Sequence, residues 1–95
     1  MKNISKRRMN QVNKVYKSLI DLGLKVNEPI FKDGDNDGSE ISEYSFYIPS
    51  RRVRFGVMKC YEDIDNILEY YFMDDFVSYK EVEKGLSLSF VLNNM

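Results

Sequence analysis

Three aspartates lie at alternate positions in one short stretch, Asp33-Gly34-Asp35-Asn36-Asp37-Gly38. Carboxylate and amide oxygens at alternate positions, followed by a glycine that permits a sharp turn, are a pattern that can hold calcium. The spacing makes Asp33, Asp35 and Asp37 candidate calcium ligands. An acidic connection rich in turn-forming residues explains the same stretch without a metal. Both interpretations stay open.

The same stretch resembles the first half of an EF-hand calcium loop. The resemblance covers six residues and fails further along the chain. Glu40 stands where that loop has an apolar residue, and Tyr44 stands where it has a bidentate glutamate, while Glu43 comes one position too early. The stretch also lies between expected strands, whereas an EF-hand loop lies between helices.

Acidic residues gather after residue 60, where 8 Asp and Glu face 2 Lys and Arg. Three of them recur at helical spacing and two more extend the charge, giving the set Glu62, Asp65, Glu69, Asp74 and Asp75. Three or four helical residues advance about 5–6 Å, which is close to the spacing of successive phosphates. Such a row can imitate nucleic acid toward a basic groove of another protein. We treat these five residues as the candidate protein-binding site, with an ordinary polar helix face as the alternative.

Basic residues gather in the first 60 positions, where 12 Lys and Arg face 7 Asp and Glu. The candidate contacts for nucleic acid are Arg7, Arg8, Lys14, Tyr47, Arg51, Arg52 and Arg54. If they share one surface, the cations would contact phosphates and Tyr47 would stack on a base. A solvated helix face and a charged hairpin that discourages edge pairing explain them equally well. The pI of about 5.4 speaks against a dedicated nucleic-acid-binding protein.

Several kinds of chemistry lack the residues that they need. The 95 residues contain no histidine and one cysteine, Cys60, so the usual triads, histidine zinc sites and CxxC redox pairs are excluded. No phosphate-binding glycine motif is present. We therefore expect a protein that is not an enzyme and that has no cofactor, apart from the calcium alternative.

Hydrophobic periodicity predicts where the first elements lie. Apolar residues at helical spacing predict a helix over about residues 4–22, capped by Asn3 and ended by Gly23. Residues 24–31 are expected to form a strand that lies at a sheet edge or breaks at Pro29, because Pro29 cannot donate a ladder hydrogen bond. Residues 41–48 and 52–59 alternate as a hairpin does. Its expected register pairs Ile48 with Val53, Phe46 with Phe55 and Tyr44 with Val57, which puts all six on one face.

The second half of the chain is read from weaker patterns. A second helix is expected over about residues 62–73, with Tyr71 and Phe72 on its inner face. Residues 76–80 fit a strand, or a short helix with Ser78 and Glu81 as a capping box. Residues 86–92 alternate and are expected to form a last strand. The sequence thus predicts one domain, residues 1–95, of α+β class. It is a small antiparallel sheet with two helices on one face, in the order α-β-β-β-α-(β or short α)-β.

Function follows from composition and charge only in outline. Phe, Tyr, Met, Ile, Asn and Lys make up 42 of the 95 residues and alanine is absent, which resembles translation of AT-rich DNA. We expect a small binding or inhibitor protein of phage or mobile-element type, acting in the cytoplasm of a low-GC bacterium. It would occupy a charged surface of a larger host protein or nucleoprotein, as anti-CRISPR proteins do. The alternative is an accessory protein that binds nucleic acid. No apolar run is long enough to span a membrane, and the oligomeric state is not indicated.

Overall fold

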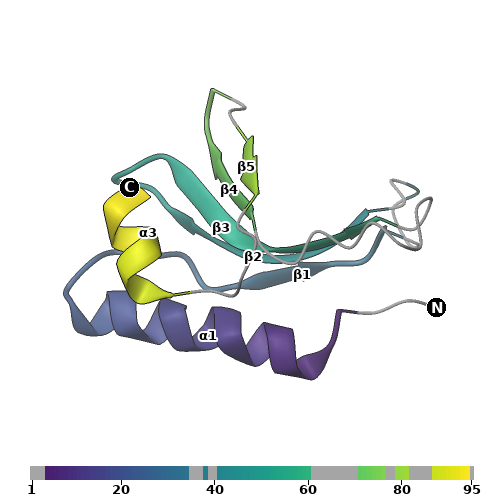
Figure 1. Ribbon diagram of the computed structural model, residues 1–95, viewed down its shortest axis with the longest axis horizontal. Helices are drawn as coiled ribbons and strands as arrows, with labels where there is room; N and C mark the ends of the chain where they lie inside the picture. The colour runs from purple at the N-terminus through teal and green to yellow at the C-terminus, as the bar shows by residue number, and fades with distance from the viewer. Residues whose placement is uncertain are drawn as a thin grey trace.

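A computed structural model of the chain describes residues 4–34, 38, 41–60, 71–76, 79–81 and 87–94. The described residues form two helices and five strands, in the order α1 (Lys6–Asp21), β1 (Ile30–Lys32), β2 (Ile41–Ile48), β3 (Val53–Cys60), β4 (Tyr71–Asp74), β5 (Tyr79–Glu81) and α3 (Leu88–Asn94). All strand pairs are antiparallel, and the strands lie in the sheet in the order of the sequence. Figure 1 shows α1 and α3 on the same side of the sheet, while β4 and β5 rise away from α1. The predicted α+β class, a small antiparallel sheet with two helices, is confirmed.

The first helix, α1, spans Lys6–Asp21 and confirms the helix predicted near residues 4–22. Its N-cap is Ser5, whose Oγ accepts a hydrogen bond from the Arg8 backbone N–H at 3.3 Å. The prediction of Asn3 as the cap is therefore wrong, because the helix begins at Lys6, directly after Ser5. Buried positions on its inner side are Val12, Val15 and Leu19. Helical spacing places these three on one stripe, and that stripe faces the sheet.

Gly23 ends α1 as its position predicts. Its φ of 88° is in the left-handed region, where glycine pays no steric penalty. The Gly23 N–H donates to the Ile20 carbonyl at 2.9 Å and the Leu24 N–H donates to the Leu19 carbonyl at 3.1 Å. These two bonds form a Schellman motif, which satisfies carbonyls that the helix leaves free. Leu24 then packs against the core.

The β2–β3 hairpin has the predicted register. β2 spans Ile41–Ile48 and β3 spans Val53–Cys60, with Ile48 opposite Val53, Phe46 opposite Phe55 and Tyr44 opposite Val57. Side chains alternate across a strand, so this register brings all six to the face that α1 covers. Five of the six are buried, and Tyr44 packs against them.

The turn of the hairpin places Arg52 in an unusual conformation. Its N–H donates to the Ile48 carbonyl at 2.9 Å, which closes the four-residue connection. Its φ is 57°, in the left-handed region that favours glycine or asparagine. The turn therefore holds an arginine at a position where backbone geometry would select another residue type.

The edge strand β1, Ile30–Lys32, is shorter than expected. Only the end of the predicted strand 24–31 pairs with β2, and Pro29 directly precedes it. The Asn27 N–H still donates to the Tyr47 carbonyl at 2.9 Å. The prediction of an edge strand is confirmed, since β1 is at the edge of the sheet and begins directly after Pro29. The predicted strand is wrong over residues 24–29, which form no strand.

An aromatic row crosses the core from α1 to β4. Tyr16 and Phe46 have ring centroids 6.2 Å apart, Phe46 and Phe55 6.1 Å, and Phe55 and Phe72 6.0 Å. Such tilted and edge-on pairs stabilise a core beyond the area that they bury. The row joins one helix and three strands, so it fixes how α1 sits on the sheet.

The helix expected over residues 62–73 is wrong in its last part. Tyr71–Asp74 forms strand β4, with Tyr71 opposite Gly56 and Phe72 opposite Phe55. Helical spacing had placed Tyr71 and Phe72 on one face, but in the strand they point to opposite faces. Pairing with β3 therefore overrides the local periodicity. Residues 62–70 of that helix lie outside the described residues.

The last strand expected over residues 86–92 is also wrong. Residues Leu88–Asn94 form helix α3, and Val91 is fully buried in the core beside the partly buried Leu88. These two are three positions apart, which is one turn of a helix face. Before it, β5 spans Tyr79–Glu81, which supports the strand alternative for this region and contradicts the capping box that used Glu81.

Candidate functional site

The face of the sheet opposite α1, here called the outer face, gathers charged and aromatic side chains. Alternation along β2 sends Phe46 and Ile48 inward, so Glu43 and Tyr47 project outward. The register places Arg54 of β3 directly opposite Tyr47. Arg54 also lies over the Tyr47 ring, with its guanidinium carbon 5.8 Å from the ring centroid. Two adjacent strands thus form a cation–aromatic pair on a rigid surface.

Asp75 joins the turn after β4 to the β2–β3 turn. Its Oδ2 accepts hydrogen bonds from the Tyr47 hydroxyl at 2.7 Å and from Arg52 Nε at 3.0 Å. The Asp75 backbone N–H also donates to the Arg52 carbonyl at 3.0 Å. Two hydrogen bonds to Arg52 therefore hold these two turns against each other, and the third ties Asp75 to Tyr47 of β2.

These bonds move the pKa values of Asp75 and Tyr47 in opposite directions. The hydrogen bond from Tyr47, followed by that from Arg52, lowers the pKa of Asp75 from 3.8. The same hydrogen bond to Asp75 raises the pKa of Tyr47 above 10.0. At neutral pH the carboxylate is ionised and the phenol is protonated, which is the pairing that the geometry needs.

Glu43 forms a second polar centre on the outer face. Its Oε1 lies 3.5 Å from Lys32 Nζ and 3.9 Å from an Arg54 guanidinium nitrogen. Its Oε2 accepts a hydrogen bond from the Tyr71 hydroxyl. Burial, followed by the bond to Glu43, raises the pKa of Tyr71 well above its usual range. One carboxylate therefore links β1, β2, β3 and β4.

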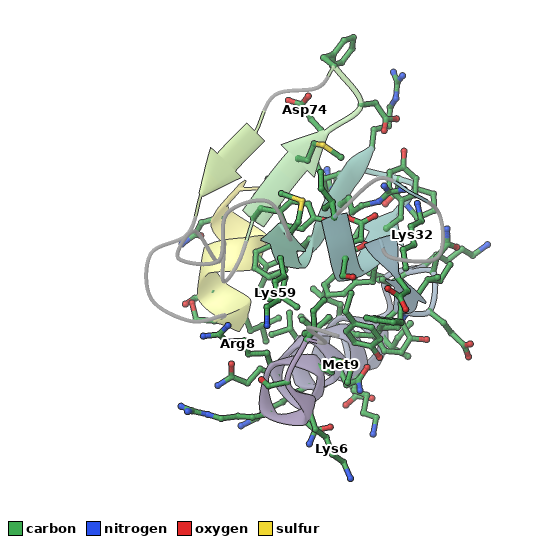
Figure 2. The ribbon with its side chains drawn as sticks, turned by 90° about the vertical axis from the view of Figure 1, so that its right-hand side faces the viewer. Lys6, Arg8, Met9, Lys32, Lys59 and Asp74 are labelled. Carbon is green, nitrogen blue, oxygen red and sulfur yellow. The ribbon has the colours of Figure 1, made fainter. Side chains whose placement is uncertain are left out.

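A shallow pocket of about 160 Å³ lies beside this centre, along β1. Its walls combine the apolar Ile30 and the Tyr47 ring with the cations Lys32 and Arg54. Ile30 is 60% exposed. Figure 2 shows Lys32 beside the sheet, above α1, whereas Lys6 projects below α1. The pocket can receive a side chain or a small group from outside.

Phe76 is the most exposed large apolar residue described, with 79% of its surface accessible. Its backbone N–H donates to Asp74 Oδ1 at 2.9 Å, which fixes the turn. The Arg52 guanidinium carbon lies 5.3 Å from the centroid of its ring. The ring is therefore held in solvent by its neighbours at the tip of the outer face.

The residues of the acidic set have different roles where they are described. Asp75 pairs with the hairpin, and Asp74 accepts the Phe76 N–H. Glu62, Asp65 and Glu69 lie outside the described residues. The two charged halves of the chain thus meet in part, because Asp75 of the acidic half binds Arg52 of the basic half.

The basic residues do not share one surface. Arg7, Arg8 and Lys14 lie on α1, whereas Tyr47 and Arg54 lie on the outer face, with the sheet between the two groups. Arg52 forms an ion pair with Asp75 and lies over the Phe76 ring, and Arg51 is exposed in the hairpin turn. A single footprint built from all seven residues is therefore not formed.

The calcium motif is described only at its ends. Asp33 is half-buried, and Asp35 and Asp37 lie outside the described residues. The Gly34 N–H donates to the buried Ser42 Oγ at 3.0 Å, which anchors the start of the loop. Within the described ranges no group of three or more acidic, cysteine or histidine side chains is placed to hold a metal. Calcium binding by Asp33, Asp35 and Asp37 stays a prediction.

The sequence patterns did not identify three residues of the outer face as part of the candidate site. Glu43 is on the outward side of β2 by alternation, and that signal was available. Tyr71 and Phe76 could not be assigned, because the strand that carries Tyr71 was expected to be a helix. Their roles depend on the β3–β4 register, which only the folded chain sets.

No helix of the described residues is long and apolar enough to cross a membrane. Comparison of the chain with family models, with curated proteins and with solved structures finds no match in any of the three.

Proposed function

We propose that the protein is a non-enzymatic binding protein that docks on a larger host protein or nucleoprotein through its outer face. The observation that carries this proposal is Phe76, which is 79% exposed and held in place by Arg52 and Asp74. Aromatic residues and arginines dominate the binding energy of protein interfaces. An aromatic ring that is already ordered loses little entropy on binding.

The residue types around Phe76 support the same proposal. Arg52 lies against the Phe76 ring, and Tyr47 bonds to the neighbouring Asp75. Arg54 lies over the Tyr47 ring, and Ile30 adds apolar surface beside the pocket. Phe, Tyr and Arg are enriched in interfaces, where a partly apolar centre is ringed by polar groups. The pocket of about 160 Å³ offers a recess for a partner's side chain.

The pairing of the hairpin arginines favours a protein partner over phosphates at this face. Arg52 is bonded to Asp75, and Arg54 lies 3.9 Å from Glu43. A phosphate would compete with these carboxylates and would meet their negative charge. A protein surface can instead place both an acid and a base against the mixed-charge face.

Among the described residues, the pKa shifts of the outer face do not favour a general acid or base. The pKa values of Tyr47 and Tyr71 rise and that of Asp75 falls, so all three move away from neutral pH. A general acid or base works best with a pKa near the operating pH. We propose no cofactor. Size, charge and the AT-rich composition support a phage or mobile-element inhibitor, of which anti-CRISPR proteins are an example.

The first test is capture of partners from a low-GC bacterial lysate by tagged protein, with and without nuclease. We expect a stoichiometric protein that survives nuclease and that is lost with Phe76→Ala. Leu22→Ala is the matched control, because Leu22 is 58% exposed at the end of α1, away from the outer face. Its capture should equal that of the wild type. The proposal is wrong if both variants retain the partner, or if only nucleic acid is captured.

The same capture separates the outer face from the acidic set. A Glu62→Lys plus Asp65→Lys variant reverses charge on that set without touching Phe76. Loss of the partner with this variant but not with Phe76→Ala would transfer the contact to the acidic residues.

A further inference from the structure

The exposed side of α1 carries cations that form no ion pair within the described structure. Between Lys6 and Lys17, every exposed residue is basic or is Asn10, and the cations are Lys6, Arg7, Lys14 and Lys17. None of these four forms an ion pair with a carboxylate of the described residues, and the carboxylates Glu43 and Asp75 pair with cations of the outer face instead. Asp21 is the acid of the helix, at its carboxyl end. We call these four cations the α1 row.

The α1 row is rigid and straight. Its members lie within one side of a regular helix, because residues 7 and 14 are two turns apart and residues 14 and 17 are about one turn apart. From Lys6 to Lys17 the row is about 17 Å long at 1.5 Å per residue. Figure 2 shows Lys6 projecting away from the sheet. The row is therefore open to solvent along its length.

We infer that the α1 row binds the phosphate backbone of duplex nucleic acid. Double-stranded DNA carries one charge per about 1.7 Å of its axis with both strands counted, so about 17 Å of duplex carries roughly ten phosphate charges, of which the four cations can neutralise four. This surface lies on the opposite side of the sheet from Phe76, so the inference does not rest on the proposed function.

The composition of the row selects a duplex over other anionic partners. Binding to a single strand depends on aromatic side chains that stack on bases, and the exposed residues from Lys6 to Lys17 include none. A protein interface needs an apolar centre, which the row also lacks. Long basic side chains without such anchors suit sequence-independent contacts to a backbone.

The test is fluorescence anisotropy with a labelled 20-base-pair duplex of mixed sequence, between 50 and 200 mM NaCl. Four neutralised phosphates give a slope of about −3.6 in log K against log salt, so the association constant should fall roughly 150-fold over this range. Lys14→Gln plus Lys17→Gln leaves two contacts, and the same change in salt should then cost only about 12-fold.

The matched control removes two charges elsewhere. Lys25→Gln plus Arg51→Gln changes exposed cations of the loop after α1 and of the hairpin turn. The control should keep the wild-type slope, and circular dichroism should give both double variants the wild-type melting temperature within a few degrees. An equal loss of slope in the control overturns the inference, because net charge alone would then explain binding.

Competitors decide between anionic partners. Unlabelled duplex should displace the probe at a lower concentration than a single strand or polyglutamate of equal charge. Equal competition by polyglutamate would assign the row to an acidic protein, and equal competition by the single strand would remove the preference for a duplex. Absence of binding at 50 mM NaCl with 100 µM protein would also overturn the inference, since non-specific affinities lie at about 10⁻⁴–10⁻⁶ M even at physiological salt.

Discussion

At the scale of single residues, Arg52 combines a strained backbone with a side chain that makes two contacts. Its φ of 57° disfavours any residue with a Cβ, by about 1 kcal/mol. Its guanidinium reaches both Asp75 and Phe76. Strain of this kind persists where the surrounding structure requires it, and it often marks a functional position. The contacts of the Arg52 side chain, and not the backbone conformation of the turn, explain why an arginine occupies this position.

The left-handed backbone of Arg52 predicts that glycine at this position gives a more stable protein than alanine does. Arg52→Ala and Arg52→Gly both remove the contacts with Asp75 and Phe76, but only glycine relieves the left-handed backbone. We expect Arg52→Gly to be more stable than Arg52→Ala by about 1 kcal/mol in urea unfolding. At an ordinary position glycine is the less stable of the two, because its unfolded chain is freer. Equal stabilities, or alanine as the more stable, would contradict a strained Arg52.

At the scale of elements, the close approach of β2 and β3 depends on Gly56. A Cβ at this position would lie 2.6 Å from the Ser45 Cα and would also meet the Tyr44 carbonyl oxygen. Both are backbone atoms of the paired strand, so neither can turn aside. The missing side chain also leaves room for Tyr71, which faces Gly56 across the β3–β4 pair and is 2% exposed.

Gly56→Ala should therefore destabilise the protein by about 1–3 kcal/mol, as overpacking does. Gly23→Ala is the comparison, because a Cβ there meets nothing within 4 Å and the cost comes only from its positive φ, about 1 kcal/mol. Thermal unfolding should rank wild type, Gly23→Ala and Gly56→Ala in falling order. A Gly56→Ala variant as stable as the wild type would show that the strands can separate without penalty.

The elements also show what the sequence can predict. Strict alternation on both sides of a short turn determined the β2–β3 register, since a slip by one residue would expose Phe46 and Phe55. Helical spacing and Gly23 determined α1. By contrast, Tyr71 and Phe72 continue a helical pattern, and their strand exists because β3 offers an edge to pair with. The prediction of the candidate site was affected most by this error, because the positions of Tyr71, Asp75 and Phe76 depend on the pairing of β4 with β3.

At the scale of the whole molecule, the net charge of −1 hides two surfaces of different character. The outer face is a network in which Glu43 and Asp75 neutralise Arg52, Arg54 and Lys32 in part. The α1 row faces away from it with cations left unpaired in the described structure. The sheet separates the two surfaces, so each can be changed while the other is kept.

The same network predicts how stability depends on pH. The pKa of Asp75 is lowered by folding, so its contribution is complete above its unfolded pKa of about 4 and is lost as the pH falls further. The pKa of Tyr71 is raised, so its contribution is complete below about pH 10 and is lost as the pH rises. The melting temperature should therefore fall at both ends, below about pH 4 and above about pH 10.

Two variants test which residue causes the fall in melting temperature at acid pH (the acid limb) and at alkaline pH (the alkaline limb). Asp75→Asn should start from a lower melting temperature at pH 6 and lose less between pH 5 and about pH 2 than the wild type, since its amide does not titrate. Asp21→Asn, at the end of α1 and away from the network, should follow the wild type. Tyr71→Phe should flatten the alkaline limb alone. If Asp75→Asn instead parallels the wild type in acid, the link between the β2–β3 turn and the turn after β4 does not depend on the Asp75 charge. The ordering of Phe76 would then have to come from the Asp74 hydrogen bond and the Arg52 stack alone.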